Sequence, residues 1–159
     1  MNGRENIKMN NSKFLYNNEG LCMIGIMSIL EIVKEMNYSK IMLIAPIIFN
    51  EKSRKFLASN STVRSLEEFE IKQNIIVSKF NSMYYNYLSI SINSLVILAD
   101  MNFIELKSDK IKIKESLIEK IDKKKIGKRA NQIIKISKKV INIINEPEEK
   151  IYMQLGVVL

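Results

Sequence analysis

The most restrictive feature of this sequence is an apolar stretch near its amino end, residues 21–33 (LCMIGIMSILEIV). Apolar side chains occur there at nearly every position, and charges gather only toward the end, at Glu31, Lys34 and Glu35. A helix that is hydrophobic on all sides is a buried helix. We therefore expect residues 19–36 to form a helix enclosed by the rest of the fold or by a partner. The stretch is shorter than the ~20 apolar residues that span a bilayer, so no membrane helix is predicted.

The next segment, residues 41–49 (IMLIAPIIF), is ambiguous. Its β-branched residues favour a strand, whereas Pro46 disfavours a central one. Residues 51–58 are predicted to form a short helix. The Ser, Asn and Thr residues of 59–65 (SNSTVRS) indicate a loop.

Residues 66–114 carry the pattern of a winged helix-turn-helix. Apolar side chains at 69, 76, 80, 83 and 87 form one helical stripe. Ser89 and Ser91 are predicted N-caps of a second helix, 92–101. The inward face of that helix would consist of Ile92, Leu95, Val96 and Ala99. Two alternating runs, 103–106 and 111–114, flank Ser108 and Asp109 and indicate a β-hairpin.

The last third of the chain is predicted to be helical again. A short helix at 115–121 precedes an amphipathic helix at 126–145, which Pro147 stops. A final turn at 148–155 leads into an apolar tail. The expected fold is mainly α with a small β-hairpin: a winged helix-turn-helix-like domain with N-terminal helices and a C-terminal amphipathic helix. We treat residues 1–159 as one compact unit with parts 19–58, 59–121 and 122–159.

Composition excludes several chemistries. The chain has no His, one Cys and five scattered Gly. It therefore lacks a Ser-His-Asp triad, an imidazole or thiolate metal cluster, an internal disulfide and a glycine-rich phosphate loop. Neighbouring carboxylates at Glu67, Glu68 and Glu70 leave a small carboxylate enzyme as one alternative, but adjacent residues on a helix do not face each other. We predict no catalytic residue, cofactor, metal or small-molecule substrate.

Positive charge is concentrated in one part of the chain. The formal net charge is +8, and residues 107–139 alone hold thirteen Lys/Arg against four Asp/Glu. Such a concentration is typical of phosphate contacts, although a solvated face is an equal alternative. The candidate contacts to double-stranded DNA are Lys110, Lys112, Lys114, Lys123, Lys124, Lys125, Lys128, Arg129, Lys135, Lys138 and Lys139.

Sequence-specific DNA reading is not expected. The predicted second helix exposes Asn93, Ser94, Ile97 and Asp100, without the Arg or Lys that usually reaches base edges. Lysine contacts to phosphate position a protein without reading sequence. A free-standing winged-helix transcriptional regulator is therefore the alternative rather than the preferred function.

Apolar side chains at both ends are candidate partner contacts. The tail either docks on its own core or inserts into a partner, since apolar surface is costly to leave in water. The candidate partner-binding residues are Leu21, Ile24, Met27, Arg64, Tyr152, Leu155, Val157, Val158 and Leu159. Residues 1–18 are polar and lack the apolar region of a signal peptide, and the lone Cys22 lies in an apolar run, so a cytoplasmic protein is expected.

Several motifs in order resemble a known family. They are NEGL at 18–21, LIAPII at 43–48, STVRSL at 61–66, a helix pair with a hairpin, and YMQLGV at 152–157. The set is similar to the middle component of bacterial three-component ABC antiphage defence systems, the group that includes Lamassu-type systems. The resemblance covers almost the whole chain and includes Arg64 of the loop.

This resemblance implies a small winged-helix subunit between an SMC-like ATPase, which senses foreign or broken DNA, and an effector, often a nuclease. It also implies that the Pro46 segment is helical, and it offers no catalytic residue. The expected function is thus a non-enzymatic adaptor, with double-stranded DNA reached through the complex.

Overall fold

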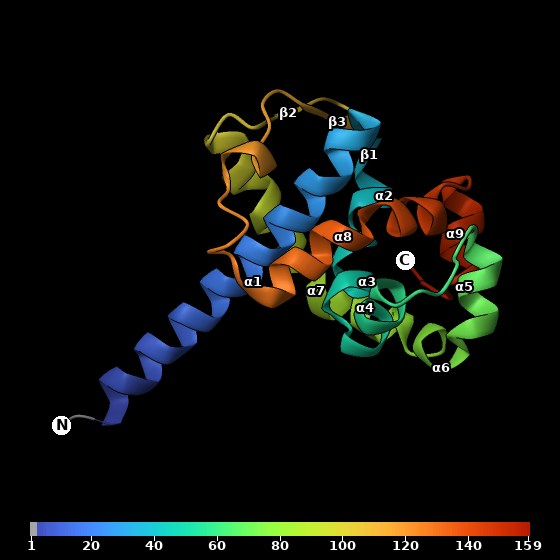
Figure 1. Ribbon diagram of the computed structural model, residues 1–159, viewed down its shortest axis with the longest axis horizontal. Helices are drawn as coiled ribbons and strands as arrows, with labels where there is room; N and C mark the ends of the chain where they lie inside the picture. Colours follow the sequence, from blue (N-terminus) through green and yellow to red (C-terminus); the bar gives the residue numbers. More distant parts are fainter. Residues whose placement is uncertain (1–2) are drawn as a thin grey trace.

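The computed structural model describes residues 3–159, with side chains described from Asn18 onward. Its helices are α1 (Gly3–Val33), α2 (Tyr38–Ile41), α3 (Ile44–Phe49), α4 (Glu51–Ala58), α5 (Leu66–Lys72), α6 (Asn74–Val77), α7 (Phe80–Asp100), α8 (Gly127–Ile144) and α9 (Glu148–Gln154), with a 3₁₀ turn η1 (Ile118–Lys120). Within the described residues, strands β1 (Glu35–Asn37), β2 (Ile104–Leu106) and β3 (Lys110–Ile113) form one antiparallel sheet. The fold is mainly α with a small sheet, as predicted (Figure 1).

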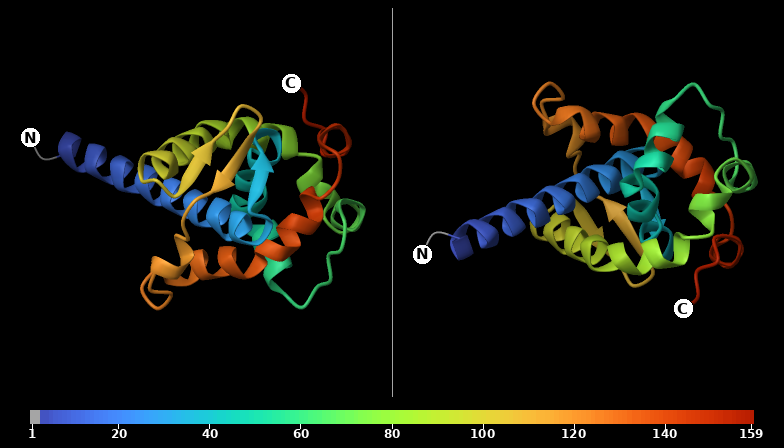
Figure 2. Two further views of the ribbon diagram at one scale, coloured as in Figure 1. Left: turned by 90° about the horizontal axis from the view of Figure 1, so that it is seen from above. Right: turned by 90° about the horizontal axis from the view of Figure 1, so that it is seen from below.

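Helix α1 lies at the centre, with α7 along one side and α8 along the other (Figure 2). Cys22, Ile26, Met27 and Leu30 are fully buried between these helices and α3. The apolar stretch at residues 21–33 therefore forms the buried helix that the sequence predicts.

Gly25 sets how closely the helices approach α1. A Cβ built on Gly25 would lie 2.5 Å from the Ile48 Cδ1 of α3 and 3.4 Å from the Ile133 Cγ2 of α8. Only hydrogen fits there, because real Cβ atoms do not approach other carbons so closely. The missing side chain thus lets α3 and α8 pack against the same turn.

The predicted end of the first helix, at residue 36, is wrong. Lys34 adopts a left-handed conformation with φ of 70°, and its amide donates to the Leu30 carbonyl. The chain then reverses direction and becomes β1. This strand pairs with β3, placing Met36 opposite Ile111, so the sheet has the order β1–β3–β2. The hairpin predicted from the alternating runs is present, and the helix end adds a third strand to it.

The ambiguous segment at 41–49 is helical, as the family resemblance implies. Its last six residues form α3, and all of their side chains are buried. Pro46 is the third residue of α3, where a backbone amide has no intrahelical partner to lose. Helix α4 and the loop at 59–65 match the predicted boundaries.

The single helical stripe predicted for residues 66–87 is wrong. The chain there forms α5, α6 and the start of α7, with non-helical backbone at Gln73 and Lys79. Phe69, Ile76 and Phe80 are nevertheless buried. Apolar spacing consistent with one helix is here produced by three helices that share a core.

The turn predicted at Ser89 and Ser91 is also wrong, because α7 continues through it. The hydroxyl of Ser91 donates to the Tyr87 carbonyl one turn back, so the serine is accommodated within the helix rather than capping one. The register of the helix also differs from the prediction. Ile92 and Val96, predicted to face inward, are about half exposed.

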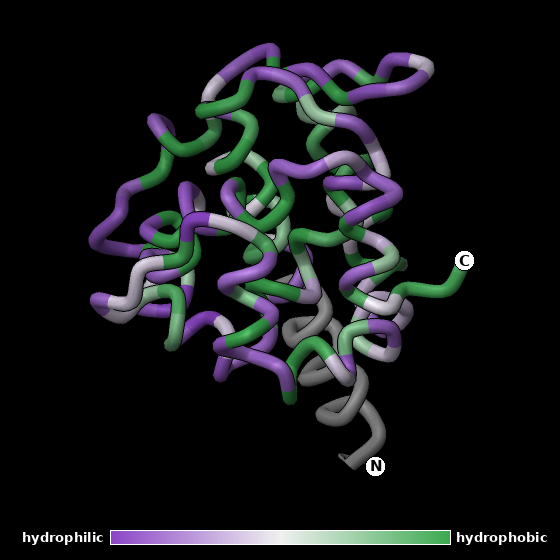
Figure 3. The backbone as a smooth tube through the Cα atoms, turned by 90° about the vertical axis from the view of Figure 1, so that its right-hand side faces the viewer, coloured by the Kyte–Doolittle hydropathy of each residue, from purple (hydrophilic) through white to green (hydrophobic). Residues whose placement is uncertain are grey.

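The carboxyl-terminal part follows the prediction more closely. Helix α8 matches the amphipathic helix, and Ala130, Ile133 and Val140 are buried on its inner face. The short helix expected at 115–121 is reduced to η1. Helix α9 follows Pro147, and the apolar tail runs from it to the end of the described chain (Figure 3).

None of the described helices combines the length and the apolar character that crossing a bilayer requires. The expectation about a signal peptide concerns residues 1–18. Residues 1–2, and the side chains up to residue 17, lie outside what the structure describes.

Candidate functional site

The structure divides the predicted basic residues into three groups. The hairpin carries Lys110, Lys112 and Lys114; the segment before α8 and its first turn carry Lys123, Lys124, Lys125, Lys128 and Arg129; the rest of α8 carries Lys135, Lys138 and Lys139. The hairpin and the first turn of α8 lie at opposite ends of the connecting segment 115–126 (Figure 1).

Lysines of the hairpin hold the sheet together. The Lys110 Nζ lies 2.7 Å from the Glu35 Oε1 of the neighbouring strand. This hydrogen bond lowers the pKa of Glu35 and raises the pKa of Lys110. Lys114 donates to the side-chain oxygen of Asn102, the residue with positive φ that follows α7. Lys112 is exposed and stands in register with Glu35 on one strand and Glu105 on the other.

Two lysines of α8 bind the end of α4 and the loop that follows. The Lys139 ammonium donates to three carbonyl oxygens, those of Leu57 (2.7 Å), Ser59 (2.9 Å) and Ser61 (2.7 Å). Lys135 donates to the Ala58 carbonyl at 3.3 Å. Carbonyls at the end of a helix carry its negative dipole, which attracts a cation.

The loop at 59–65 is held along most of its length. Asn142 of α8 donates to the Val63 carbonyl at 3.0 Å, and Lys72 of α5 donates to the Thr62 carbonyl at 2.7 Å. The Ser65 hydroxyl accepts from the Glu68 amide and caps α5. Arg64 is exposed on this fixed loop.

The group before α8 is the most exposed of the three. Lys123, Lys124 and Lys125 lie on a turn that Asp122 begins, with the Lys124 amide donating to its carboxylate at 3.0 Å. The Asn131 side chain donates to the Lys123 carbonyl at 2.8 Å and fixes the turn to α8. The Lys125 Nζ lies 3.8 Å from the Asp122 carboxylate.

The amino end of α8 adds further positive character to this turn. No side chain caps the helix, whose first residue is Gly127 with φ of 83°. Uncapped amides at a helix start attract anions. Lys128 and Arg129 project from the first turn, and the Arg129 guanidinium lies 5.2 Å from the centre of the Phe49 ring. We call residues 122–129 the basic turn.

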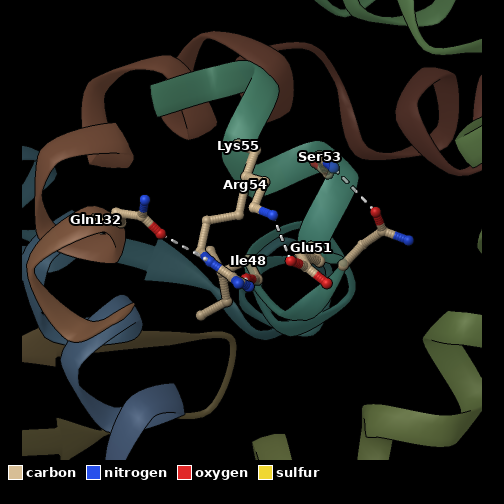
Figure 4. Close-up of polar contacts among 7 residues, drawn as sticks. Ile48, Glu51, Ser53, Arg54, Lys55 and Gln132 are labelled. Carbon is tan, nitrogen blue, oxygen red and sulfur yellow. Dashed lines mark hydrogen bonds and ion pairs between the residues drawn. The ribbon is translucent and has the colours of Figure 1, made fainter. Parts of the chain in front are cut away.

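Helix α4 packs against α8 and brings Arg54 close to Gln132 of α8 (Figure 4). Arg54 is only 7% exposed and donates to the Ile48 carbonyl at 3.0 Å and to the Gln132 side-chain oxygen at 3.3 Å. Burial and the nearby Arg129 lower the pKa of Arg54. Lys52 is exposed on the same helix. Lys52 and Arg54 lie outside the basic segment 107–139 in the sequence, so a charge count along the chain does not group them with it.

The predicted partner residues divide by burial. Leu21, Ile24 and Met27 belong to α1, where Met27 is fully enclosed and Leu21 is partly covered. Tyr152, Leu155 and Val157 are buried in the core of this chain. The exposed members of the predicted set are Arg64, Val158 and Leu159.

Tyr152 anchors α9 to the core. Its hydroxyl donates to the Ser39 carbonyl at 2.7 Å and lies 3.4 Å from the Tyr84 hydroxyl. Burial and the neighbouring Tyr84 raise the pKa of Tyr152. This contact explains why the first part of the tail is covered by its own chain. Exposed apolar residues that the sequence did not single out include Ile71, Ile75 and Met153, each of which is more than 60% exposed.

Most of the chain matches a known protein family. A family model described as ABC-three component (ABC-3C) system Middle Component 3 matches residues 31–159. No curated protein and no solved structure matches the chain significantly. The matched range contains the loop at 59–65, the basic turn and the tail.

Proposed function

The chain belongs to the Middle Component 3 family of ABC-three component systems, and we propose that it is a non-enzymatic adaptor linking an SMC-like ATPase to an effector nuclease. Membership of a multi-component system implies partner proteins. The family match over residues 31–159 is the observation that supports the adaptor role, and the motif resemblance supports the SMC-like ATPase and the nuclease as its partners. A role in antiphage defence of the Lamassu type follows from the motif resemblance and is part of the same proposal.

Contact with double-stranded DNA is proposed for the basic turn. Its lysines are exposed, whereas Lys110, Lys135 and Lys139 donate to groups of their own chain. Lysine contacts of this kind bind phosphate without reading bases and weaken steeply with salt. The DNA would thus be bound through the assembled complex and without sequence preference.

Helix α7 weighs against a free-standing transcriptional regulator. Its exposed face carries Ser82, Asn86, Ser89, Asn93 and Asp100, without a basic side chain. In a recognition helix that lies in the major groove, the commonest specific contact to a base edge is made by Arg or Lys. Asn93 is engaged with Glu19 of α1 at 3.0 Å.

The test of the adaptor function is affinity purification of the tagged chain from its native host at native expression, read by mass spectrometry. We expect an SMC-like ATPase and a second protein in fixed ratio. Recovery of the chain alone, bound preferentially to one DNA sequence, would contradict the proposal and favour a regulator.

A further inference from the structure

Helices α5, α6 and α9 and the tail lie at one end of the molecule (Figure 1), and each of them carries an exposed apolar side chain. Ile71, Ile75, Met153, Val158 and Leu159 are between 64% and 87% exposed. Single exposed apolar residues are ordinary, but a group of them on one surface marks an interaction site. We call this group the apolar end.

Contacts between the elements place these side chains on one surface. The Lys150 Nζ lies 2.8 Å from the Glu67 Oε1 and joins α9 to α5. Ile71 follows Glu67 by four residues and Met153 follows Lys150 by three, so each lies on the helix face that carries its half of this ion pair.

The tail joins the same surface through α7. The Val158 amide donates to the Asn81 side-chain oxygen at 3.0 Å, and its carbonyl accepts from the Tyr85 hydroxyl. Asn81 lies in the first turn of α7, which directly follows α6 and Ile75. The tail backbone is thus fixed, while its last two side chains remain exposed.

Carboxylates outnumber lysines on α5, on α9 and on the turn before α9. Helix α5 carries Glu67, Glu68 and Glu70, and the start of α9 with the preceding turn carries Glu146, Glu148 and Glu149. Some of these groups are engaged within the chain, since Glu68 accepts from the Arg64 amide and Glu148 accepts from the Asn37 side chain. Lys72 binds the Thr62 carbonyl, and Lys150 binds Glu67 and Glu146. The surface therefore attracts positive charge, in contrast with the basic turn.

We infer that the apolar end binds an amphipathic helix of another component of the system, with an apolar face flanked by Lys and Arg. This inference rests on the proposed adaptor function. An amphipathic helix binds by laying its apolar face on an exposed apolar surface. Basic flanks match the carboxylates of α5 and α9. A second copy of this chain would place the same carboxylates against each other across a twofold contact, which is repulsive.

The test compares two matched double variants in the full chain. Ile71→Asn with Met153→Gln removes two of the five side chains of the apolar end, one from α5 and one from α9, and Ile92→Asn with Val96→Gln removes exposed apolar side chains from α7. All four side chains are exposed, so both variants should keep the wild-type circular dichroism and melting temperature. The Kd for each purified partner component is then measured. We expect the first variant to bind one component at least tenfold more weakly and the second to bind as wild type does.

A charge variant tests the nature of the flanks. Glu70→Lys with Glu149→Lys should weaken the same binding severalfold and remove part of its salt dependence. Asp100→Lys, on the exposed face of α7, is the control and should bind as wild type does.

These measurements distinguish the role of the apolar end from the proposed adaptor function. If wild type assembles and the Ile71/Met153 variant binds every component with unchanged Kd, the inference is overturned and the adaptor function stands. If wild type binds no component, both are overturned. If light scattering shows a wild-type dimer that the Ile71/Met153 variant converts to a monomer, the apolar end binds a second copy and the inference is overturned.

Discussion

Lysines that look alike in the sequence have different roles in the fold. Lys138 and Lys139 are adjacent on α8, yet Lys138 is exposed and Lys139 donates to three carbonyl oxygens of α4 and its loop. A charge count along the chain assigns both to one basic segment. Only the packing of α4 against α8 separates them.

Replacing Lys139 should therefore destabilise the protein, and replacing Lys138 should not. Lys139→Met leaves three carbonyls without their donor, and hydrogen bonds to a charged group contribute about 2 kcal/mol. We expect the free energy of unfolding to fall by about 2 kcal/mol in Lys139→Met and to change by less than about 0.5 kcal/mol in Lys138→Met. Urea denaturation of the two variants measures this. Equal losses would contradict the assignment of Lys139 to a structural role.

Residue burial shows what the sequence could and could not predict. The apolar stretch at 21–33 is largely buried, as predicted, with Ile32 exposed near its end, because a helix that is apolar on all sides is stable only when most of it is covered. The partner role predicted for Val157 and the DNA role predicted for Lys135 depend on tertiary contacts, which the sequence alone does not give. Both meet their own chain, as Val157 is buried and Lys135 binds Ala58.

At the scale of elements, Gly25 decides how α1, α3 and α8 pack. Gly25→Ala places a methyl group 2.5 Å from the Ile48 Cδ1, so this buried side chain would have to shift within the core. Overpacking of about 1–3 kcal/mol outweighs the gain of about 1 kcal/mol from replacing glycine in a helix. We expect a net loss of about 1 kcal/mol on thermal or urea unfolding.

Gly20 is the matched control for Gly25, because it lies on the same helix and a Cβ added there would have nothing within 4 Å. Gly20→Ala should stabilise the protein by roughly 0.5–1 kcal/mol. If Gly25→Ala were as stabilising as Gly20→Ala, the close approach of the three helices would be contradicted.

The contact between α5 and α9 should make stability depend on pH. The Lys150 hydrogen bond, helped by the backbone amide of Glu67 and by Ser65, lowers the pKa of Glu67 from 4.5 to about 2. A carboxyl with a lowered pKa contributes stability above its unfolded-state pKa and loses it as pH falls toward the folded-state pKa. The contribution is therefore complete above about pH 4.5 and disappears toward about pH 2.

Melting temperatures of wild type and Glu67→Gln measure this contribution. The variant should melt below wild type at neutral pH, and the difference should shrink as pH falls through this window. A difference that is independent of pH would contradict the ion pair between α5 and α9.

Element boundaries were predictable where local signals are strong. Helices α4 and α8 and the hairpin follow from spacing, Pro147 and turn residues. The continuity of α7 was not predictable, because serine both caps helices and bonds back within them. The end of α1 depends on the left-handed backbone of Lys34. This conformation is unusual for a residue other than glycine, so the sequence does not predict it.

At the scale of the whole molecule, the basic turn and the apolar end lie on different elements and carry opposite charge. The sequence predicted the first from a concentration of lysines. Of the second, Val158 and Leu159 were predicted as partner contacts. Ile71, Ile75 and Met153 were not, because they come from segments far apart in the chain that the fold brings together, as the contact of Glu67 with Lys150 does for α5 and α9.

Charge reversal of the basic turn should weaken DNA binding by the assembled complex. Reversal of Lys123, Lys124, Lys125 and Lys128 to Glu removes four exposed cations while leaving the core intact. We expect the affinity to fall at least tenfold and the salt slope to become shallower by several units. Reversal of the exposed Lys79 and Lys138 is the control. Unchanged affinity and salt slope in the fourfold variant would exclude the basic turn as a DNA contact.

The adaptor function requires that this chain bind the other two components at the same time. Mass photometry of the purified ATPase, effector and chain, mixed in pairs and all together, shows which complexes form. The result does not depend on which surface of the chain makes each contact. We expect the chain to form a complex with each component, and ATPase and effector to appear in one particle only when the chain is present. Association of ATPase and effector without the chain, to the same extent as with it, would contradict the adaptor function.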